Sequence, residues 1–308
     1  MLGQRKVLMS IRSARLKTWF LETRPHFLLL SVVLAFLGAC IAWYDGALHL
    51  GYAILAFVGI LLAHISVNVL NDYFDYRSGI DLETRRTPFS GGSGILPASL
   101  LKPTQVLWFG LICLLLDIPI GVYFVIARGW ALLPLLLVAV ICILLYSPFI
   151  LKTRWPEWSP GLGMGTLPVL GAYFVQTATY TLPAIVASIP SGILVHNLLL
   201  LNEFPDIEAD KKAGRRTLPI TMGGRGASIV YSALTLIVYL WIIGIAVARQ
   251  EPFLLIALLT LPLAIKAIRG ALKYQEMSKL VPAMGNNVLV VLLTQLLLGI
   301  GYILATVF

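Results

Sequence analysis

The sequence predicts an all-α fold, a polytopic membrane protein with nine transmembrane helices. Of its 308 residues, 59% are hydrophobic and only 12% are charged, whereas soluble domains carry about a quarter of charged residues. The mean hydropathy is +0.90, so the chain has too little polar surface to dissolve in water. Its apolar residues fall into runs of about 20, the length that a helix needs to cross a bilayer.

Nine such runs follow one another along the chain. Their interior prolines, Pro119, Pro190 and Pro262, are compatible with spanning helices because neighbouring helices can satisfy the freed carbonyl groups. The sequence shows no soluble domain and no low-complexity linker, so we expect residues 1–308 to form one membrane-embedded domain. The expected spans are 26–45, 51–73, 105–127, 129–150, 161–180, 182–205, 226–248, 252–271 and 286–307.

The first 25 residues are basic and amphipathic. Their basic residues are Arg5, Lys6, Arg12, Arg15, Lys17 and Arg24. Apolar residues are interleaved with them, a pattern typical of a cytoplasmic, interfacial helix that lies on an anionic membrane surface. A nucleic-acid-binding arm would leave these apolar residues in water. We therefore expect the lipid bilayer, and no nucleic acid, as the partner of this segment.

Basic residues between the predicted spans lie almost entirely on one side of the membrane. Of the 23 Lys and Arg residues, only Arg128 and Arg249 fall on the other side. The positive-inside rule then places the N-terminus in the cytoplasm and, with nine spans, the C-terminus outside. We expect an integral protein of a prokaryotic cell (inner) membrane, whose net charge of +9 reflects its topology.

The first polar constellation is HISVNVLNDYFDYRSGID (64–81), at the end of the second predicted span. Because successive helical residues turn by about 100°, five polar side chains fall within roughly 100° of arc. This stripe consists of His64, Asn68, Asn71, Asp72 and Asp75. Gly79 suits the position just after the helix, and Asp81 lies on the loop beyond it, able to fold back.

The second constellation is NEFPDIEADKKAGRRTLP (202–219), at the end of the sixth predicted span. Asn202, Asp206 and Asp210 recur every four residues and share one face of a helix. Pro205 lacks a backbone donor and is expected to kink the helix just before Asp206. The second and sixth spans run in the same direction, so both constellations emerge on the cytoplasmic side.

Two facing groups of carboxylates at a membrane boundary repel one another and are costly to desolvate. A divalent cation removes this difficulty, and Mg²⁺ prefers oxygen ligands that are completed by substrate phosphates. The pattern therefore predicts a shared metal–phosphate site. A single acidic residue such as Asp45 is read as a solvated helix end, and Asp117 as a hydrogen-bonding partner. His64 and His196 are read as packing residues rather than metal ligands.

The two motifs resemble those of the UbiA-type intramembrane prenyltransferases, which show NxxxD followed by a further Asp, and then NxxxDxxxD. The resemblance begins at TRPHFLLL (23–30), continues through LYSPFILKTR (145–154) and covers nearly the whole chain. Nine helices are also the number in that family. The resemblance implies a Mg²⁺-dependent transferase that binds a polyprenyl diphosphate, ionises its allylic C–O bond and passes the carbocation to an aromatic acceptor.

The resemblance also implies roles for individual residues. The expected metal ligands are Asn71, Asp72, Asp75, Asp81, Asn202, Asp206 and Asp210. Diphosphate binding is expected from Arg77, Lys152, Arg154, Lys211, Arg215, Asn68 and Asn202. The expected catalytic residues are Asp75, Asp206, Tyr146 and Lys152. Lys152 and Arg154 could instead only enforce topology, and Tyr146 could be an interfacial aromatic residue.

The six-residue step from Asp75 to Asp81 resembles the 1,4-dihydroxy-2-naphthoate polyprenyltransferases of menaquinone synthesis. In those enzymes the second motif usually reads NN-x-R-D, whereas here Glu203 replaces the second Asn and Pro205 the Arg. A glycine-rich loop, PFSGGSGIL (88–96), is a second departure. Prenyl transfer to 4-hydroxybenzoate, homogentisate or a glycerol-phosphate lipid, and a membrane transporter, are the alternatives. No protein partner is predicted.

Overall fold

The computed structural model describes residues 15–84 and 86–308, and within these ranges it contains helices and no β-strand. The predicted all-α class is therefore confirmed. Six helices have 20 or more residues. They are α2 (Pro25–Tyr44), α3 (Leu50–Ser78), α5 (Pro103–Arg128), α9 (Leu182–Asn202), α12 (Gly223–Arg249) and α14 (Met277–Val307).

The other three predicted spans are built from shorter pieces joined end to end. They are η1 (Trp130–Leu132) with α6 (Leu133–Leu145), α7 (Trp158–Gly161) with the π-helical η3 (Leu162–Thr166) and α8 (Leu167–Thr177), and η5 (Pro252–Thr260) with α13 (Leu261–Ala271). Seven segments of the described chain are long and apolar enough to cross a membrane, and the first two composite runs are not among them. The number nine thus remains a prediction.

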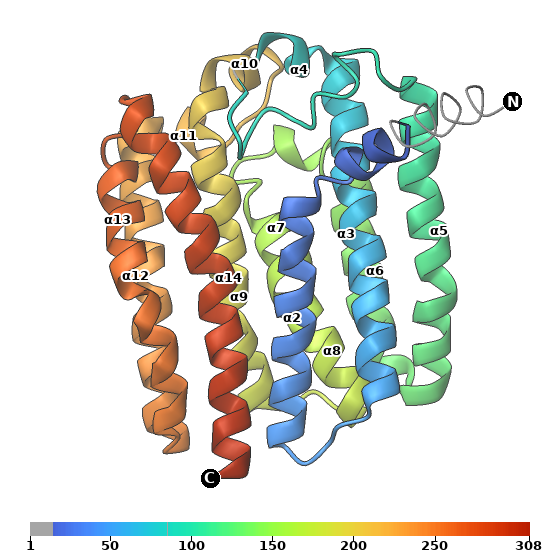
Figure 1. Cartoon of the computed structure of the whole chain (residues 1–308), viewed down its shortest axis with the longest axis vertical. Helices are drawn as coiled ribbons and strands as arrows, with labels where there is room; N and C mark the ends of the chain where they lie inside the picture. Colours follow the sequence, from blue (N-terminus) through green and yellow to red (C-terminus); the bar gives the residue numbers. More distant parts are fainter. Residues whose placement is uncertain (1–14, 85) are drawn as a thin grey trace, which may run out of the picture.

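The helices stand side by side in one bundle, with α2 near the middle of Figure 1. α2 packs against α14, α8 and α3. Its side chains Leu34, Leu37 and Ile41 are fully buried in the largest apolar core. Gly38 permits the closest approach, because a Cβ atom there would come within 2.4 Å of the Val169 carbonyl oxygen on α8. The central helix is thus fixed by backbone-to-backbone packing.

The outer surface of the bundle is rich in large apolar side chains. Ile126, Trp130, Leu240 and Val247 are among the most exposed. Such a surface would aggregate in water, and it is the surface that a helix bundle presents to lipid. The structure and the composition therefore agree on a membrane protein.

Short elements cover one end of the bundle, the upper end in Figure 1. They are α4 (Ile80–Glu83), η2 (Ile150–Lys152), η4 (Phe204–Asp206), α10 (Ile207–Lys212) and α11 (Leu218–Thr221). α3 ends there at Gly79, whose φ of +81° confirms the predicted helix stop. The chain's C-terminus lies at the opposite end.

Only part of the predicted interfacial helix lies within the described residues. Residues 15–22 are helical, and Leu16 and Phe20 are exposed on them. The basic residues Arg5, Lys6 and Arg12 lie outside the described part of the chain. The membrane-surface role of this segment therefore stays a prediction.

Candidate active site

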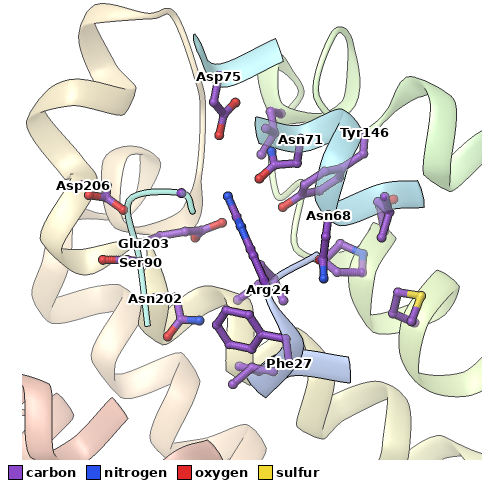
Figure 2. A pocket seen from close by; sticks show the side chains of 18 of the residues that line it. Arg24, Phe27, Asn68, Asn71, Asp75, Ser90, Tyr146, Asn202, Glu203 and Asp206 are labelled. Atoms are coloured by element: carbon purple, nitrogen blue, oxygen red, sulfur yellow. The ribbon is translucent and has the colours of Figure 1, made fainter. Parts of the chain in front are cut away.

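The first motif forms one wall of a cavity at the covered end of the bundle. His64, Asn68, Asn71 and Asp75, four members of the predicted stripe, line this cavity. The amide nitrogen of Asn68 donates to the Thr23 carbonyl oxygen at 3.2 Å. That of Asn71 donates to Ser147 Oγ at 3.0 Å. The protein thus uses the amide N–H groups and leaves the Asn71 side-chain oxygen available to a ligand (Figure 2).

Asp72, the fifth member of the stripe, does not line the cavity. Its side chain is buried and ion-paired with Arg24. Its second oxygen accepts the backbone N–H of Ser93 at 2.9 Å. The structure therefore places Asp72 behind Arg24, as a support between α3 and the glycine-rich loop, and its assignment as a metal ligand stays a prediction.

The second motif faces the first across the cavity. α9 ends at Asn202, the 3-10 turn η4 contains Pro205 and Asp206, and α10 begins at Ile207. The α-helix is thus interrupted at Pro205 by a 3-10 turn, and the helical run then continues through α10 to Lys212. Asn202, Asp206 and Asp210 all line the cavity, and Figure 2 shows Asp206 and Asn202 opposite Asp75 and Asn71.

Arg215 connects the two motifs. Its guanidinium donates to Asp210 Oδ1 at 2.9 Å and also pairs with Asp75 Oδ1. Burial alone would lower the pKa of Arg215, but the charges of Asp75 and Asp210 outweigh this and raise it above its usual value. The residue is therefore a permanent positive charge in the cavity wall, placed between the carboxylates of both motifs.

Arg24 is a second cation in the cavity, and the sequence analysis assigned it only to the basic N-terminal segment. It precedes α2 in a left-handed conformation, with φ 53° and ψ 61°. This conformation and the Asp72 ion pair turn its guanidinium towards the middle of the cavity (Figure 2). The resemblance at TRPHFLLL contained the signal, because Arg24 directly precedes the proline that opens the helix.

The other predicted cations lie elsewhere. Arg77, Lys152, Arg154 and Lys211 are exposed and are not among the residues that line the cavity. Periodicity cannot place the ends of long, flexible side chains, so their assignment to the diphosphate stays a prediction. Tyr146, which directly follows α6, does line the cavity.

The glycine-rich loop closes the cavity from the covered end. Phe89, Ser90, Gly91 and Gly92 line it together with Asp81 of α4. Gly92 has a φ of +72°, and a Cβ atom there would lie 2.9 Å from Asp81 Oδ2. Burial, with the nearby charge of Asp75, raises the pKa of Asp81 to about 6. The glycine thus lets the loop backbone pass directly over this carboxyl group.

Residues 31–305 match the model of the UbiA prenyltransferase family. This chain belongs to the UbiA prenyltransferase family. A relative from Bacillus subtilis, named 1,4-dihydroxy-2-naphthoate octaprenyltransferase, is 31% identical over 92% of this chain and 91% of its own length. The chain is accordingly an integral membrane enzyme, a prenyltransferase.

Solved structures show the same fold. A UbiA homologue from Aeropyrum pernix K1 has a TM-score of 0.68 at 16% identity, covering 90% of this chain and 97% of its own. A UbiA homologue from Archaeoglobus fulgidus, solved with GPP and Mg²⁺, has a TM-score of 0.60 at 15% identity, covering 91% of this chain and 99% of its own. The UbiA fold predicted from the two motifs is therefore confirmed.

The donor atoms of this UbiA site suit a magnesium ion. The cavity offers carboxylate and amide oxygens, and the buried Asn202 Oδ1 has no hydrogen-bond partner. Among the described residues, no three His, Cys, Asp or Glu side chains come together as a metal site. Such an arrangement fits Mg²⁺, which keeps water or substrate oxygens as part of its shell, and it does not fit a metal that needs a preformed protein cage.

The two histidines considered with the motifs, His64 and His196, have partners in the protein. Ser31 Oγ lies 2.9 Å from Nδ1 of the buried His64. In His196, Nε2 accepts from Trp155 Nε1 at 2.7 Å, and Nδ1 lies 3.1 Å from Asn197 Oδ1. These contacts agree with the interpretation that both are packing residues.

A second, mostly apolar cavity adjoins the first. Its lining comes from α3, α5, α6, η3 and α8. It shares Ala139, Ile143, Gly163 and Met164 with the first cavity. Asp117 of α5 lines it, with Oδ1 beside Gly59 of α3. The two cavities thus have a common wall.

Proposed function

We propose that this enzyme transfers a polyprenyl group from a polyprenyl diphosphate to 1,4-dihydroxy-2-naphthoate, a step of menaquinone synthesis. The observation that carries the proposal is the meeting of both motifs with Arg24 and Arg215 around one cavity that continues into an apolar one. The name of the Bacillus subtilis relative supports the acceptor, and so does the step from Asp75 to Asp81.

The diphosphate is expected between the two motifs. The residues that would hold Mg²⁺ with the diphosphate oxygens are Asn71, Asp75, Asp81, Asn202, Asp206 and Asp210. Bound Mg²⁺ supplies positive charge that stabilises the leaving diphosphate. The Archaeoglobus fulgidus homologue was solved with GPP and Mg²⁺, which supports this cofactor and this class of donor.

The chain's own cations act on the leaving group. Negative charge develops on the diphosphate when the allylic C–O bond breaks, and cations already fixed at that place lower the barrier without reorganising. Arg215 and Arg24 are held by carboxylates, so their guanidinium groups are oriented before the substrate arrives. Charge-assisted bonds from guanidinium to phosphate oxygens are the strong kind.

The carbocation must meet the acceptor ring rather than water. Phe27 and Phe89 line the cavity with Tyr146, and the glycine-rich loop covers it. Aromatic faces carry negative charge that favours a nearby cation, and the covering loop excludes solvent. A new C–C bond then forms to the ring carbon, which releases its proton and regains aromaticity.

We further propose that the active site opens to the cytoplasm, with the C-terminus outside, in a prokaryotic cell membrane. The distribution of Lys and Arg supports this orientation. The opposite end of the bundle is tied by polar contacts: Tyr173 donates to Asp45 at 2.7 Å and Tyr44 donates to Glu251 at 2.6 Å. A site at one end favours an enzyme over a transporter, whose binding site is expected near the midplane.

The proposed function is tested with purified protein in lipid nanodiscs. Mg²⁺, an octaprenyl diphosphate and a panel of acceptors are supplied: 1,4-dihydroxy-2-naphthoate, 4-hydroxybenzoate, homogentisate and glycerol phosphate. We expect prenylated naphthoate and equimolar diphosphate, both abolished by EDTA. Metal-dependent transfer to a different acceptor would correct the substrate, and no diphosphate release with any acceptor would overturn the proposal.

A further inference from the structure

Glu203 stands out in the cavity wall because its hydrogen bonds are missing. It directly follows α9 and is 7% exposed. Both of its carboxyl oxygens are buried, and within the described chain no N–H or O–H group other than the Glu157 carboxyl group reaches them. Figure 2 shows its side chain extending into the cavity from the segment that also carries Asn202 and Asp206. Burying a carboxyl group without hydrogen-bond partners costs free energy. A ligand that supplies hydrogen-bond donors would remove this cost.

Glu157, which interacts with Glu203, and Ser159, in the cavity lining, are also short of partners. Glu157, fully buried, lies against Glu203; its Oε1 accepts the Leu218 N–H at 2.6 Å, and its Oε2 has no partner. The Ser159 hydroxyl, 1% exposed, lines the cavity and has none either. We call Glu157, Ser159 and Glu203 the polar wall. It is rich in hydrogen-bond acceptors and poor in donors.

The cations of the cavity do not account for the polar wall, because each has other partners. Arg24 is ion-paired with Asp72. Arg215 is ion-paired with Asp75 and Asp210. The missing donors are therefore expected from a bound molecule, and the other substrate in this cavity is the acceptor.

We propose that the polar wall binds a ring hydroxyl group of the aromatic acceptor, with Glu203 accepting its hydrogen bond. This inference rests on the proposed function, whose acceptor carries two such hydroxyl groups. The wall adjoins the second motif, so a ring held there lies next to the diphosphate. Tyr146 lines the same cavity as Glu203.

The proposed role of Glu203 accounts for one difference between the second motif of this chain, NEFPD, and the pattern NN-x-R-D. An Asn side chain carries one acceptor oxygen and an NH₂ group, whereas the carboxyl group of Glu203 carries two oxygens. Glu203 therefore favours acceptors with a free O–H group over their ethers. A site built to hydrogen-bond a hydroxyl discriminates strongly against analogues that lack it, because the buried group is then left unpaired.

The test compares a hydroxylated acceptor with its monomethyl ethers. For the wild type we expect kcat/KM to be at least about 100-fold higher for the free hydroxyl of one position. Glu203→Met keeps the approximate size and removes the acceptor atoms; the preference should fall to about 3-fold or less, with KM for the acceptor raised about 10-fold. KM for the polyprenyl diphosphate and the Mg²⁺ concentration for half-maximal rate should stay within about 2-fold.

Glu208→Gln is the matched control, because Glu208 is an exposed carboxylate in the same segment. Glu203→Gln should show a preference between those of the wild type and Glu203→Met. It takes the place of Glu203→Met in the test if Glu203→Met does not fold. If the Glu203 variants keep the full preference for the hydroxylated acceptor over its ether, the inference is overturned. It is also overturned if kcat/KM falls equally for the hydroxylated acceptor and the ether. A changed Mg²⁺ requirement would make Glu203 part of a cation site. If the wild type transfers the prenyl group to no acceptor, the proposed function has failed. If it transfers the prenyl group without a preference for the hydroxylated acceptor, only the inference about Glu203 has failed.

Discussion

The two motifs share the NxxxD spacing but not the backbone that carries it. In the first motif, Asn71 and Asp75 lie on one unbroken helix, α3. In the second, Asn202 is the last residue of α9, and Asp206 lies in a separate 3-10 turn. Spacing of four residues therefore does not by itself specify a helical face. What the motifs share is the destination of their side chains, a common cavity.

The difference has a consequence for each motif. On the continuous helix, side chains are fixed by the helical angle, so Asp72 points to the neighbouring segment and holds Arg24. In the broken motif, the chain turns between Asn202 and Asp210, and each polar side chain of NxxxDxxxD reaches the cavity. In the first motif an acidic side chain outside the cavity lining holds Arg24, whereas in the second motif Asp210 lines the cavity and holds Arg215.

The largest expected effect is the loss of one central carboxylate from either motif. Asp75→Ala and Asp206→Ala should each reduce kcat/KM by about 100- to 1,000-fold, because each removes a group that holds charge against the diphosphate. The protein should still fold, which the thermal unfolding midpoint in detergent checks. Glu208→Ala, an exposed neighbour of Asp206, is the control. A defect confined to one of the two variants would show that the motifs are not equivalent in function.

The next effect concerns the link between the motifs. Arg215→Ala removes the cation between Asp75 and Asp210 and leaves their buried charges uncompensated. We expect kcat/KM for the diphosphate to fall about 100-fold, with partial recovery in Arg215→Lys. Arg216→Ala is the matched control, since Arg216 is exposed and its backbone N–H, rather than its side chain, donates to the Leu151 carbonyl oxygen at 3.0 Å. Equal activity of both variants would contradict the role of Arg215.

The role of Asp72 is tested by Asp72→Asn. If Asp72 holds Arg24 rather than a metal, kcat/KM should fall about 10-fold as a charge-assisted bond becomes a neutral one. The Mg²⁺ concentration for half-maximal rate should not change. Arg24→Lys should produce a similar defect, and the double variant should be less impaired than the product of the two single effects. A higher Mg²⁺ requirement in Asp72→Asn would restore its assignment as a metal ligand.

Much of this arrangement could be predicted from the sequence. The apolar runs located the helices, and the 100° rule placed Asn71 and Asp75 on a common face. The same arithmetic placed Asp72 at the far edge of the stripe, about 100° from Asn71, where a side chain can reach a neighbouring segment. This position at the edge of the stripe was the feature of the sequence that distinguished Asp72 from Asp75.

Other features depend on tertiary contacts that periodicity does not contain. Arg24 enters the cavity because of a left-handed residue and a partner 48 positions away. Lys211 directly follows Asp210 and Lys152 lies six residues after Tyr146, yet both are exposed. Pro205 indicated that the helix is interrupted. The start of α10 at Ile207, in contrast, depends on how this segment packs. Sequence reasoning therefore placed the amide and carboxylate side chains of the cavity more reliably than the cations.

The break in the second motif is tested by Pro205→Ala. Ala restores a backbone donor, so the proline no longer forbids a continuous helix. We expect kcat/KM to fall, but by less than about 10-fold, because contacts beyond the proline still position Asp206. One of these is Thr84 Oγ1, which donates to Asp206 Oδ1 at 3.2 Å. A loss as large as that of Asp206→Ala would mean that Pro205 alone holds the break open.

The smallest effect concerns the support of the first motif, through stability rather than rate. Glu22 accepts a hydrogen bond from Ser93 Oγ at 3.0 Å, and burial raises the pKa of Glu22 from 4.5 to about 7. The fold therefore favours the protonated form. The cost of ionising Glu22 is absent below about pH 4.5, grows as the pH rises, and is complete above about pH 7.

Glu22→Gln keeps an oxygen for Ser93 and cannot ionise. The variant and the wild type should unfold at similar temperatures at pH 4.5, and the variant should be more stable at pH 8, by about 2–5 °C. Glu83→Gln is the control, because Glu83 is exposed and pairs with Lys212 at the surface. A difference that does not grow with pH would show that Ser93, and with it the loop held by Asp72, is insensitive to the charge of Glu22. The first motif would then depend on Arg24 and Asp72 alone for its support.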